Sequence, residues 1–312
     1  MKRSCFVEDD VVKFIYPTRQ EIFMTKDMFG KTRIKLGLHI HTTRSDGKYE
    51  PEVAAQTYKN AGFDAIALTD HWVYGEADEL CGLPVLSGAE YNIGFVDCNE
   101  GVYHILALMC EREPDVKKED SAQHIIDEIH KAGGLSVLAH PAWSLNTPEM
   151  MLKLRDVDAT EIYNAVSDCG NSRRGESSLI VDMLGMQGCF YPLLATDDCH
   201  YYSEGDCCNA YIMAECESTD RREIMNAIKE GRFYATQGPE IHLSRVGDVF
   251  RVDSSEVSEI VFMSNACYSH RTFCGEALAS AEYKPRYPHE HYIRAYVTDK
   301  NGKRAWTNCI KI

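Results

Sequence analysis

The sequence has no pattern of paired cysteines and no long apolar run. It contains 13 cysteines, yet no two of them form a Cys-x-x-Cys pair, and Cys207 and Cys208 are directly adjacent. A chain of 312 residues can bury a large core without disulfides, so we interpret most of the thiols as small buried side chains. No run of apolar residues is long enough to cross a bilayer, and we expect no membrane partner.

Positive charge is also scarce. Lysine and arginine total 33 against 48 aspartate and glutamate residues, which gives a formal net charge of −15. This balance argues against a broad basic face that wraps a duplex, so we predict that duplex DNA is not a partner. The net charge does not exclude phosphorylated substrates, because carboxylates that hold metal ions count as negative in the formal charge while the ions themselves are not counted. Acidic residues occupy the place where a secretory signal needs an apolar core, so we expect a cytoplasmic protein.

Short apolar or β-branched segments alternate with amphipathic helical patterns through the middle of the chain. The strand-like segments are residues 34–41, 65–71, 85–90, 104–109, 135–140, 160–164 and 191–196. This alternation predicts an α/β domain over residues 34–238, with a mostly parallel sheet and a barrel-like closure.

The pattern changes after Gly238 and Pro239. Residues 239–312 show short alternating segments separated by turn signals and no helical periodicity. They predict a small antiparallel β domain. Residues 1–33 have weak periodicity, and we interpret them as an N-terminal arm.

Side chains that commonly bind metals stand at the ends of the predicted strands. Because the carboxyl ends of barrel strands open onto one rim, residues there meet in space however far apart they lie in the sequence. His39 and His41 are two residues apart on a strand, so both imidazoles face the same side. Along the chain these residues are His39, His41, His71, Glu90, His140, Asp198 and His200.

Each of these residues has a structural interpretation of its own. A single histidine at a strand end is more often a satisfied surface or core residue than a ligand. A single aspartate after a strand is commonly a helix cap, and Asp46 in Ser45-Asp46-Gly47 fits a turn equally well. The joint pattern decides for metal binding, because several independent strands would otherwise all have to end in His, Asp or Glu on the same rim.

These motifs resemble, in order, those of the polymerase and histidinol phosphatase (PHP) superfamily, in particular its small metal-dependent phosphoesterases. The first is His39-Ile40-His41-Thr42 with Ser45-Asp46-Gly47, and the second is Ala67-Leu68-Thr69-Asp70-His71. The others are Gly88-Ala89-Glu90 with His104, Ala139-His140-Pro141, and Asp198-Cys199-His200.

The resemblance implies a distorted seven-stranded, TIM-like barrel with a trinuclear metal centre. It implies a first ion held by His39, His41, Glu90 and Asp198. A second ion is held by Glu90, His104 and His140, and a third by Asp46, His71 and His200. Strand alternation favours Asp198 over Asp197, because Asp198 then shares a face with His200.

Mixed imidazole and carboxylate ligands favour zinc, manganese or iron. Two ions that share Glu90 can bridge a water and lower its pKa, which gives metal-bound hydroxide at neutral pH. We therefore predict an enzyme, a hydrolase of phosphoric esters that uses three divalent ions. We predict Glu90, Asp198 and His200 as its catalytic residues.

Three further residues are candidates for binding the substrate. Arg173 and Arg174 stand between the last two predicted strands of the barrel, where they could clamp a second phosphate or simply begin a solvated helix. Asn164 ends the sixth predicted strand and could line the pocket.

The expected substrate is a small phosphorylated molecule, with nucleotides and the ends of short single-stranded RNA among the candidates. Three alternatives stay open. The first is a PHP-type hydrolase of carboxylic or carbamic esters, and the second is a histidinol-phosphate phosphatase. The third, which the full ligand set disfavours, is a non-catalytic module stabilised by metal.

Overall fold

The computed structural model describes residues 26–94, 102–169, 172–203, 205–268 and 271–312. Most of the predicted N-terminal arm therefore lies outside the described residues. The part that is described is fixed to the body of the protein by Arg33, whose Nε donates to Asp27 and whose Nη1 donates to the carbonyl of Met213. Within the described ranges, no helix is both long enough and apolar enough to cross a membrane.

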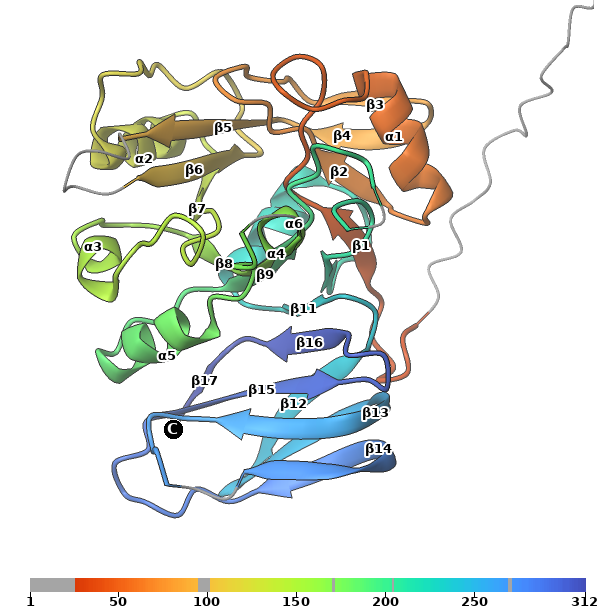
Figure 1. The fold of residues 1–312 in the computed structure, drawn as a ribbon, viewed down its shortest axis with the longest axis vertical. Helices are drawn as coiled ribbons and strands as arrows, with labels where there is room; N and C mark the ends of the chain where they lie inside the picture. Colours follow the sequence, from red (N-terminus) through yellow and green to blue (C-terminus); the bar gives the residue numbers. More distant parts are fainter. Residues whose placement is uncertain (1–25, 95–101, 170–171, 204, 269–270) are drawn as a thin grey trace, which may run out of the picture.

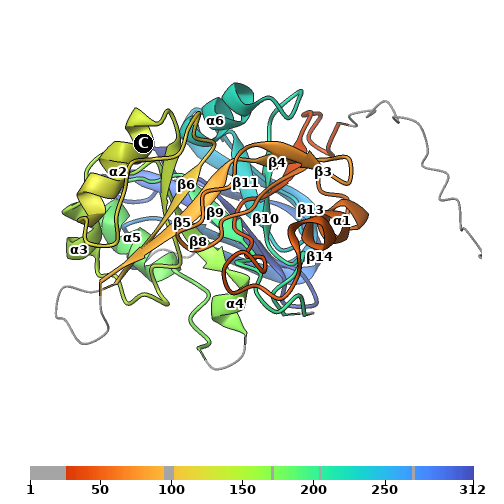
Figure 2. The same ribbon diagram turned by 90° about the horizontal axis from the view of Figure 1, so that it is seen from above.

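Six helices lie among the described residues, and they surround the strands in the view of Figure 2. Ser121 caps α2 by accepting from the amide of His124, and Asp220 caps α6 through the amides of Arg222 and Glu223. These side chains satisfy amides that the first helical turn leaves without partners. The helices are α1 (Pro51–Asn60), α2 (Ala122–Lys131), α3 (Pro148–Leu152), α4 (Ala165–Asp168), α5 (Ser178–Met186) and α6 (Arg221–Lys229).

The larger sheet begins with six strands from the α/β part of the chain. Neighbouring strands β1, β2 and β4 are parallel, while β10 runs antiparallel to both β1 and β11. The strands are β1 (Ile34–Gly37), β2 (Ala65–Ala67), β3 (Asp78–Leu80), β4 (Leu83–Leu86), β10 (Tyr211–Ala214) and β11 (Phe233–Thr236).

A second sheet has the strand order β5-β6-β7-β8-β9. Strands β7, β8 and β9 are parallel, but β6 is antiparallel to both of its neighbours. The expectation of a mostly parallel sheet is therefore wrong here. The reason is that only nine residues separate Ile93 from Tyr103, which is too few for the crossover that a parallel pair needs, so β6 reverses its direction. The strands are β5 (Gly88–Ile93), β6 (Tyr103–Leu108), β7 (Leu135–Leu138), β8 (Ala159–Asn164) and β9 (Leu193–Thr196).

The two sheets meet at single bridges. Ile40, after β1, pairs with Cys199, after β9, and His71, after β2, pairs with Glu90 in β5. Both bridges are parallel. The fold is thus of the predicted α/β class, and among the described residues the two sheets contact each other without one continuous closed ladder of hydrogen bonds. These bridges place the ends of strands from both sheets side by side.

The C-terminal strands pair antiparallel and extend the larger sheet, in blue at the bottom of Figure 1. Strand β16 pairs with β11, so the sheet continues across the predicted boundary at residue 239. The indole of Trp306 in β16 packs in the same core as Leu36 and stacks on Tyr163 at 5.3 Å. The strands are β12 (Ile241–Val246), β13 (Val249–Met263), β14 (Thr272–Tyr283), β15 (Tyr292–Thr298), β16 (Arg304–Thr307) and β17 (Ile310–Lys311).

Candidate metal centre

The nine residues expected to bind metal lie together where the two sheets meet. They come from segments that follow β1, β2, β7 and β9 and from within β5 and β6. Three overlapping groups have ligand atoms within 4.8 Å of one another. The groups are His39, His41, Glu90 and Asp198; His41, Asp46, His71 and His200; and His71, Glu90 and His104.

The first group has the dimensions of a tetrahedral metal site. Nε2 of His39 lies 3.2 Å from Nε2 of His41. Oε2 of Glu90 and Oδ1 of Asp198 each lie 3.0–3.2 Å from both nitrogens. Four ligands at about 2.0 Å from a central ion form a tetrahedron with edges of about 3.3 Å. The four side chains are therefore already spaced to hold one ion, and all four are buried.

The second group lies on the more exposed side of the centre. Oδ2 of Asp46 lies 3.4 Å from Nε2 of His200 and 3.8 Å from Nε2 of His71. His41 adds its Nδ1, 3.3 Å from Oδ1 of Asp46, so its ring borders two groups. The resemblance implied only Asp46, His71 and His200 at this position.

Glu90 connects the first group to the third. Its Oε1 lies 2.7 Å from Nδ1 of His104 and 3.2 Å from Nε2 of His140, while Nδ1 of His71 lies 3.3 Å from Oε2. His140, which the resemblance implied beside Glu90 and His104, lies next to both, with its ring 4.7 Å from that of His104. The structure also brings His71 into this group. A carboxylate shared by two groups is the arrangement that a bridging ligand requires.

Two buried atoms of the centre have no hydrogen-bond partner among the described residues. They are Oδ1 of Asp198 and Nδ1 of His71, which lie 3.1 Å from two imidazole nitrogens and 3.3 Å from Oε2 of Glu90, respectively, without forming a hydrogen bond. A buried polar atom without a partner is costly, and such atoms are rare in folded proteins. A cation in the first group would satisfy the carboxylate oxygen, and one in the third group would satisfy the imidazole nitrogen. The side chains present thus fit bound cations.

The second nitrogens of several imidazoles are held by neighbouring groups. Nδ1 of His39 contacts Glu161 at 2.8 Å, Nδ1 of His140 contacts the hydroxyl of Ser144 at 3.0 Å, and Nδ1 of His200 contacts the carbonyl of Asp198 at 2.7 Å. A ring whose Nδ1 donates to such an acceptor presents the lone pair of Nε2, which is the atom that can bind a metal. In all three rings, Nε2 faces a carboxylate of the centre.

Unusual backbone conformations aim several of these side chains. His140 and Asp198 have φ angles of 29° and 52°, in the left-handed region that residues other than glycine adopt at a cost in free energy. The amide of His140 donates to Glu161 and that of Asp198 to the carbonyl of His39, which holds both residues in place. Gly47 closes the turn that carries Asp46, and a Cβ there would lie 2.3 Å from the carbonyl oxygen of His41.

Glu161 in β8 supports the centre without being one of its expected ligands. It is fully buried. Its carboxylate accepts from the amide of His140, from Nδ2 of Asn164 and from the hydroxyl of Thr196, and it contacts Nδ1 of His39. The sequence gave no signal that the carboxylate of Glu161 orients both His39 and His140.

We expect Glu161→Gln to weaken metal binding by about 10- to 100-fold, because the amide cannot keep all of these donors and orients His39 less firmly. Isothermal titration with manganese measures this affinity. Glu128→Gln is the matched control, since Glu128 on α2 pairs with Lys131 and lies outside the three groups. Equal affinity in the two variants would show that Glu161 does not orient the ligands.

The ionisable side chains of the centre shift one another's pKa values. Burial alone would lower the pKa of His39, but the carboxylates of Asp198, Glu90 and Glu161 outweigh burial and raise it to about 10. Burial likewise opposes ionisation of Glu90, yet the nearby imidazoles hold its pKa well below the usual range. The carboxylates thus attract positive charge to this point, and metal ions that bind here must displace protons.

The weaker predictions have mixed outcomes. Asn164 is buried and is not among the residues that line the pocket, but its Nδ2 donates to Oδ2 of Asp198, so it supports a predicted ligand. Arg173 and Arg174 are exposed and do not line the pocket above the centre. The guanidinium of Arg173 instead reaches the carbonyl of Asp168 at 3.4 Å. Asp197 points away from the centre and accepts from the hydroxyl of Tyr58.

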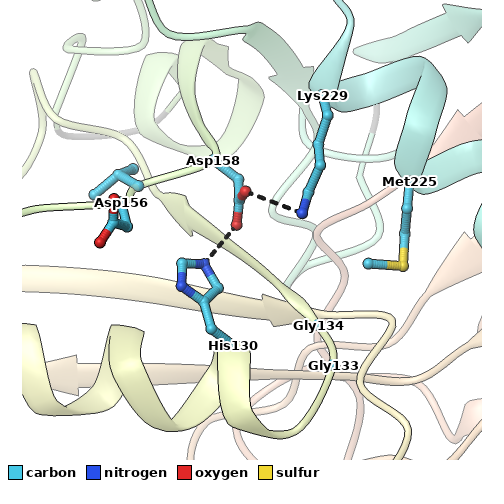
Figure 3. A pocket seen from close by; sticks show the side chains of 8 residues that line it. His130, Gly133, Gly134, Asp156, Asp158, Met225 and Lys229 are labelled. Carbon is cyan, nitrogen blue, oxygen red and sulfur yellow. Dashed lines mark hydrogen bonds and ion pairs between the residues drawn. The ribbon is translucent and has the colours of Figure 1, made fainter.

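A pocket of about 610 Å³ opens above the metal centre. Residues of all three groups line it, together with side chains from the loops after β7, β8 and β9. A second hollow, of about 330 Å³, lies beside α2 and α6. There Asp158 contacts His130 at 2.8 Å and Lys229 at 3.6 Å (Figure 3), so these three side chains pair with one another. The first pocket is therefore the candidate binding site.

No family model matches the chain. The uncharacterized protein MJ1587 of Methanocaldococcus jannaschii is 30% identical over 146 residues, which cover 42% of this chain and 82% of that protein. Among solved structures, a two-domain protein of Bacteroides vulgatus that contains a predicted PHP-like metal-dependent phosphoesterase matches with a TM-score of 0.53. It is 16% identical, and the match covers 95% of this chain and 99% of that one.

A lesion-specific endonuclease of Pyrococcus furiosus matches with a TM-score of 0.44 and 16% identity, over 64% of this chain and 56% of that one. None of these comparisons supports the exclusion of duplex DNA, which stays a prediction from net charge. The match to the two-domain protein shows the fold, and the archaeal relative shares the sequence over most of its own length. The chain thus belongs to one family with the archaeal relative, it has the fold of a protein that contains a predicted PHP-like phosphoesterase, and its ordered His, Asp and Glu motifs resemble those of the PHP superfamily.

Proposed function

We propose that this protein is a metal-dependent hydrolase that cleaves phosphate esters of small molecules. Three divalent ions of zinc, manganese or iron would be held by the nine residues of the centre. The observation that carries the proposal is the first group, in which four buried ligand atoms stand at the spacing of a tetrahedral ion. Its Asp198 Oδ1 has no hydrogen-bond partner among the described residues.

When bound, the ions would neutralise the phosphoryl oxygens and lower the pKa of the attacking water. The protein's own residues would set the arrangement. Glu90 would join two positions, because its two oxygens face different histidines. Asp198, a member of the first group, would also lie next to His200, since its Oδ1 lies 3.4 Å from Nδ1 of His200. His200 would then help to fix the third position near Asp46.

The size of the pocket supports a small substrate. About 610 Å³ lies within the range of sites that hold small molecules. A nucleotide or one end of a short single-stranded RNA fits this volume. The exposed positions of Arg173 and Arg174 remove them as clamps for a second phosphate in this conformation.

The test is phosphate release by the purified full chain from a panel of phosphomonoesters, with a carboxylic ester such as 4-nitrophenyl acetate assayed in parallel. We expect release of phosphate that excess chelator abolishes and that manganese or zinc restores. Phosphate release that persists in chelator would contradict the role of the metals. Metal-dependent cleavage of the carboxylic ester alone would favour the alternative ester hydrolase.

A further inference from the structure

The walls of the pocket above the metal centre carry no charge among the residues that the structure describes. Apart from Cys169 and Tyr201, the charged and titratable lining residues belong to the proposed metal centre. The rest of the lining is aromatic, apolar or hydroxylic. These wall residues are Trp143, Val166, Ser167, Cys169, Ser172, Tyr201 and Ser203.

No arginine or lysine is among the described residues that line the pocket, and two cationic side chains near it contact other groups. Nη1 of Arg173 contacts the carbonyl of Asp168. Nζ of Lys48 lies 4.9 Å from the ring centre of Tyr201, and Lys48 does not line the pocket. Proteins usually hold additional phosphates with arginine or lysine side chains that point at the ligand. Among the described residues, the pocket therefore offers no arginine or lysine partner for a second phosphate beside the one that the metal centre would bind.

Trp143 is the largest wall residue, and its position is fixed relative to the proposed ligands. Its ring lies 5.1 Å from the ring of His140 and 5.5 Å from that of His104, both in T-shaped contacts. Despite these contacts, 42% of the residue stays exposed. An indole that both lines the pocket and remains accessible can stack on a flat group of a ligand.

We propose that the substrate is a phosphomonoester whose alcohol part is uncharged and carries a flat, aromatic group that lies against Trp143. This inference rests on the proposed phosphoesterase function. In the reaction, water adds across the P–O bond, so that the phosphoryl group leaves as inorganic phosphate and the alcohol takes up a proton. The metal centre binds the phosphate end, and Trp143 selects the other end.

The preference is tested with two alkyl esters of comparable intrinsic reactivity, 2-phenylethyl phosphate and ethyl phosphate, on the full chain loaded with manganese. We expect kcat/KM to be about tenfold higher for the phenylethyl ester. In Trp143→Ala this ratio should fall to about one, while Trp143→Phe should keep most of it. Because both esters are compared on the same protein sample, a general loss of active enzyme cancels from the ratio.

A second comparison tests whether the pocket lacks a side chain that binds a second phosphate. Adenosine 5′-monophosphate and adenosine 3′,5′-bisphosphate share the base and differ in one phosphate. We expect kcat/KM for the bisphosphate to be no higher than for the monophosphate. A bisphosphate preference, or a phenylethyl ratio near one in the wild-type protein, overturns the inference and leaves the phosphoesterase function intact. Absence of phosphate release from all four esters contradicts the proposed function, and this inference falls with it.

Discussion

Glu90→Gln is expected to remove bound metal and to lower phosphate release by about a thousandfold or more. The reason is the position of its carboxylate, which contacts five imidazoles, those of His39, His41, His71, His104 and His140. A neutral amide can neither balance two dications nor accept from so many donors. Elemental analysis of the purified variant measures metal content, and a phosphate assay measures activity on the same sample.

The control for this variant is again Glu128→Gln, which makes the same chemical change on α2, where Glu128 pairs with Lys131. It should keep both metal and activity. Wild-type metal content and turnover in Glu90→Gln would refute the bridging role of Glu90.

Asp182→Asn is expected to destabilise the protein by about 3–5 kcal/mol, because it leaves a buried guanidinium without its counter-charge. Arg294 in β15 is fully buried, and its Nε and Nη2 each donate to Asp182 on α5 at 2.8 Å. The hydroxyl of Tyr292 contacts the same carboxylate at 3.1 Å. This cluster attaches the C-terminal strand β15 to α5 in the α/β part. Denaturant unfolding followed by circular dichroism measures the loss.

Two further variants test whether the loss of stability comes from the unpaired charge of Arg294. Asp182→Leu combined with Arg294→Met removes both charges and should recover most of the stability. Arg251→Ala removes an exposed ion pair with Asp253 and should change stability little. If Asp182→Asn were no more costly than Arg251→Ala, the cluster would not hold the two parts together.

The approach of the nine residues to one another could be predicted from sequence because strand geometry enforces it. Alternation aims His39 and His41 at one face, and the ends of neighbouring strands meet at one edge. The third group could not be assigned from the same rules, since the side chain of His71 reaches Glu90 and Asp46 from opposite sides of its ring. Which ring reaches which carboxylate depends on backbone bends that strand periodicity does not contain.

Two features of the fold could also not be predicted from the sequence patterns. The predicted strand 85–90 divides between β4, in the larger sheet, and β5, in the second sheet, and the hydroxyl of Ser87 between them donates to the carbonyl of Cys110. Gly88 allows the chain to pass close to Leu68, since a Cβ there would lie 2.7 Å from the carbonyl oxygen of Leu68. Strand β14 was not predicted because most of its side chains are exposed, so it lacks the alternation that a half-buried strand shows.

Anomalous diffraction from crystals grown with manganese tests most directly whether the nine residues hold divalent ions. We expect anomalous peaks inside the three groups, with one peak about 2.0–2.3 Å from Nε2 of His39, Nε2 of His41, Glu90 and Asp198. Crystals that bind manganese only elsewhere on the protein, or that show no peak between these four side chains, would contradict this expectation.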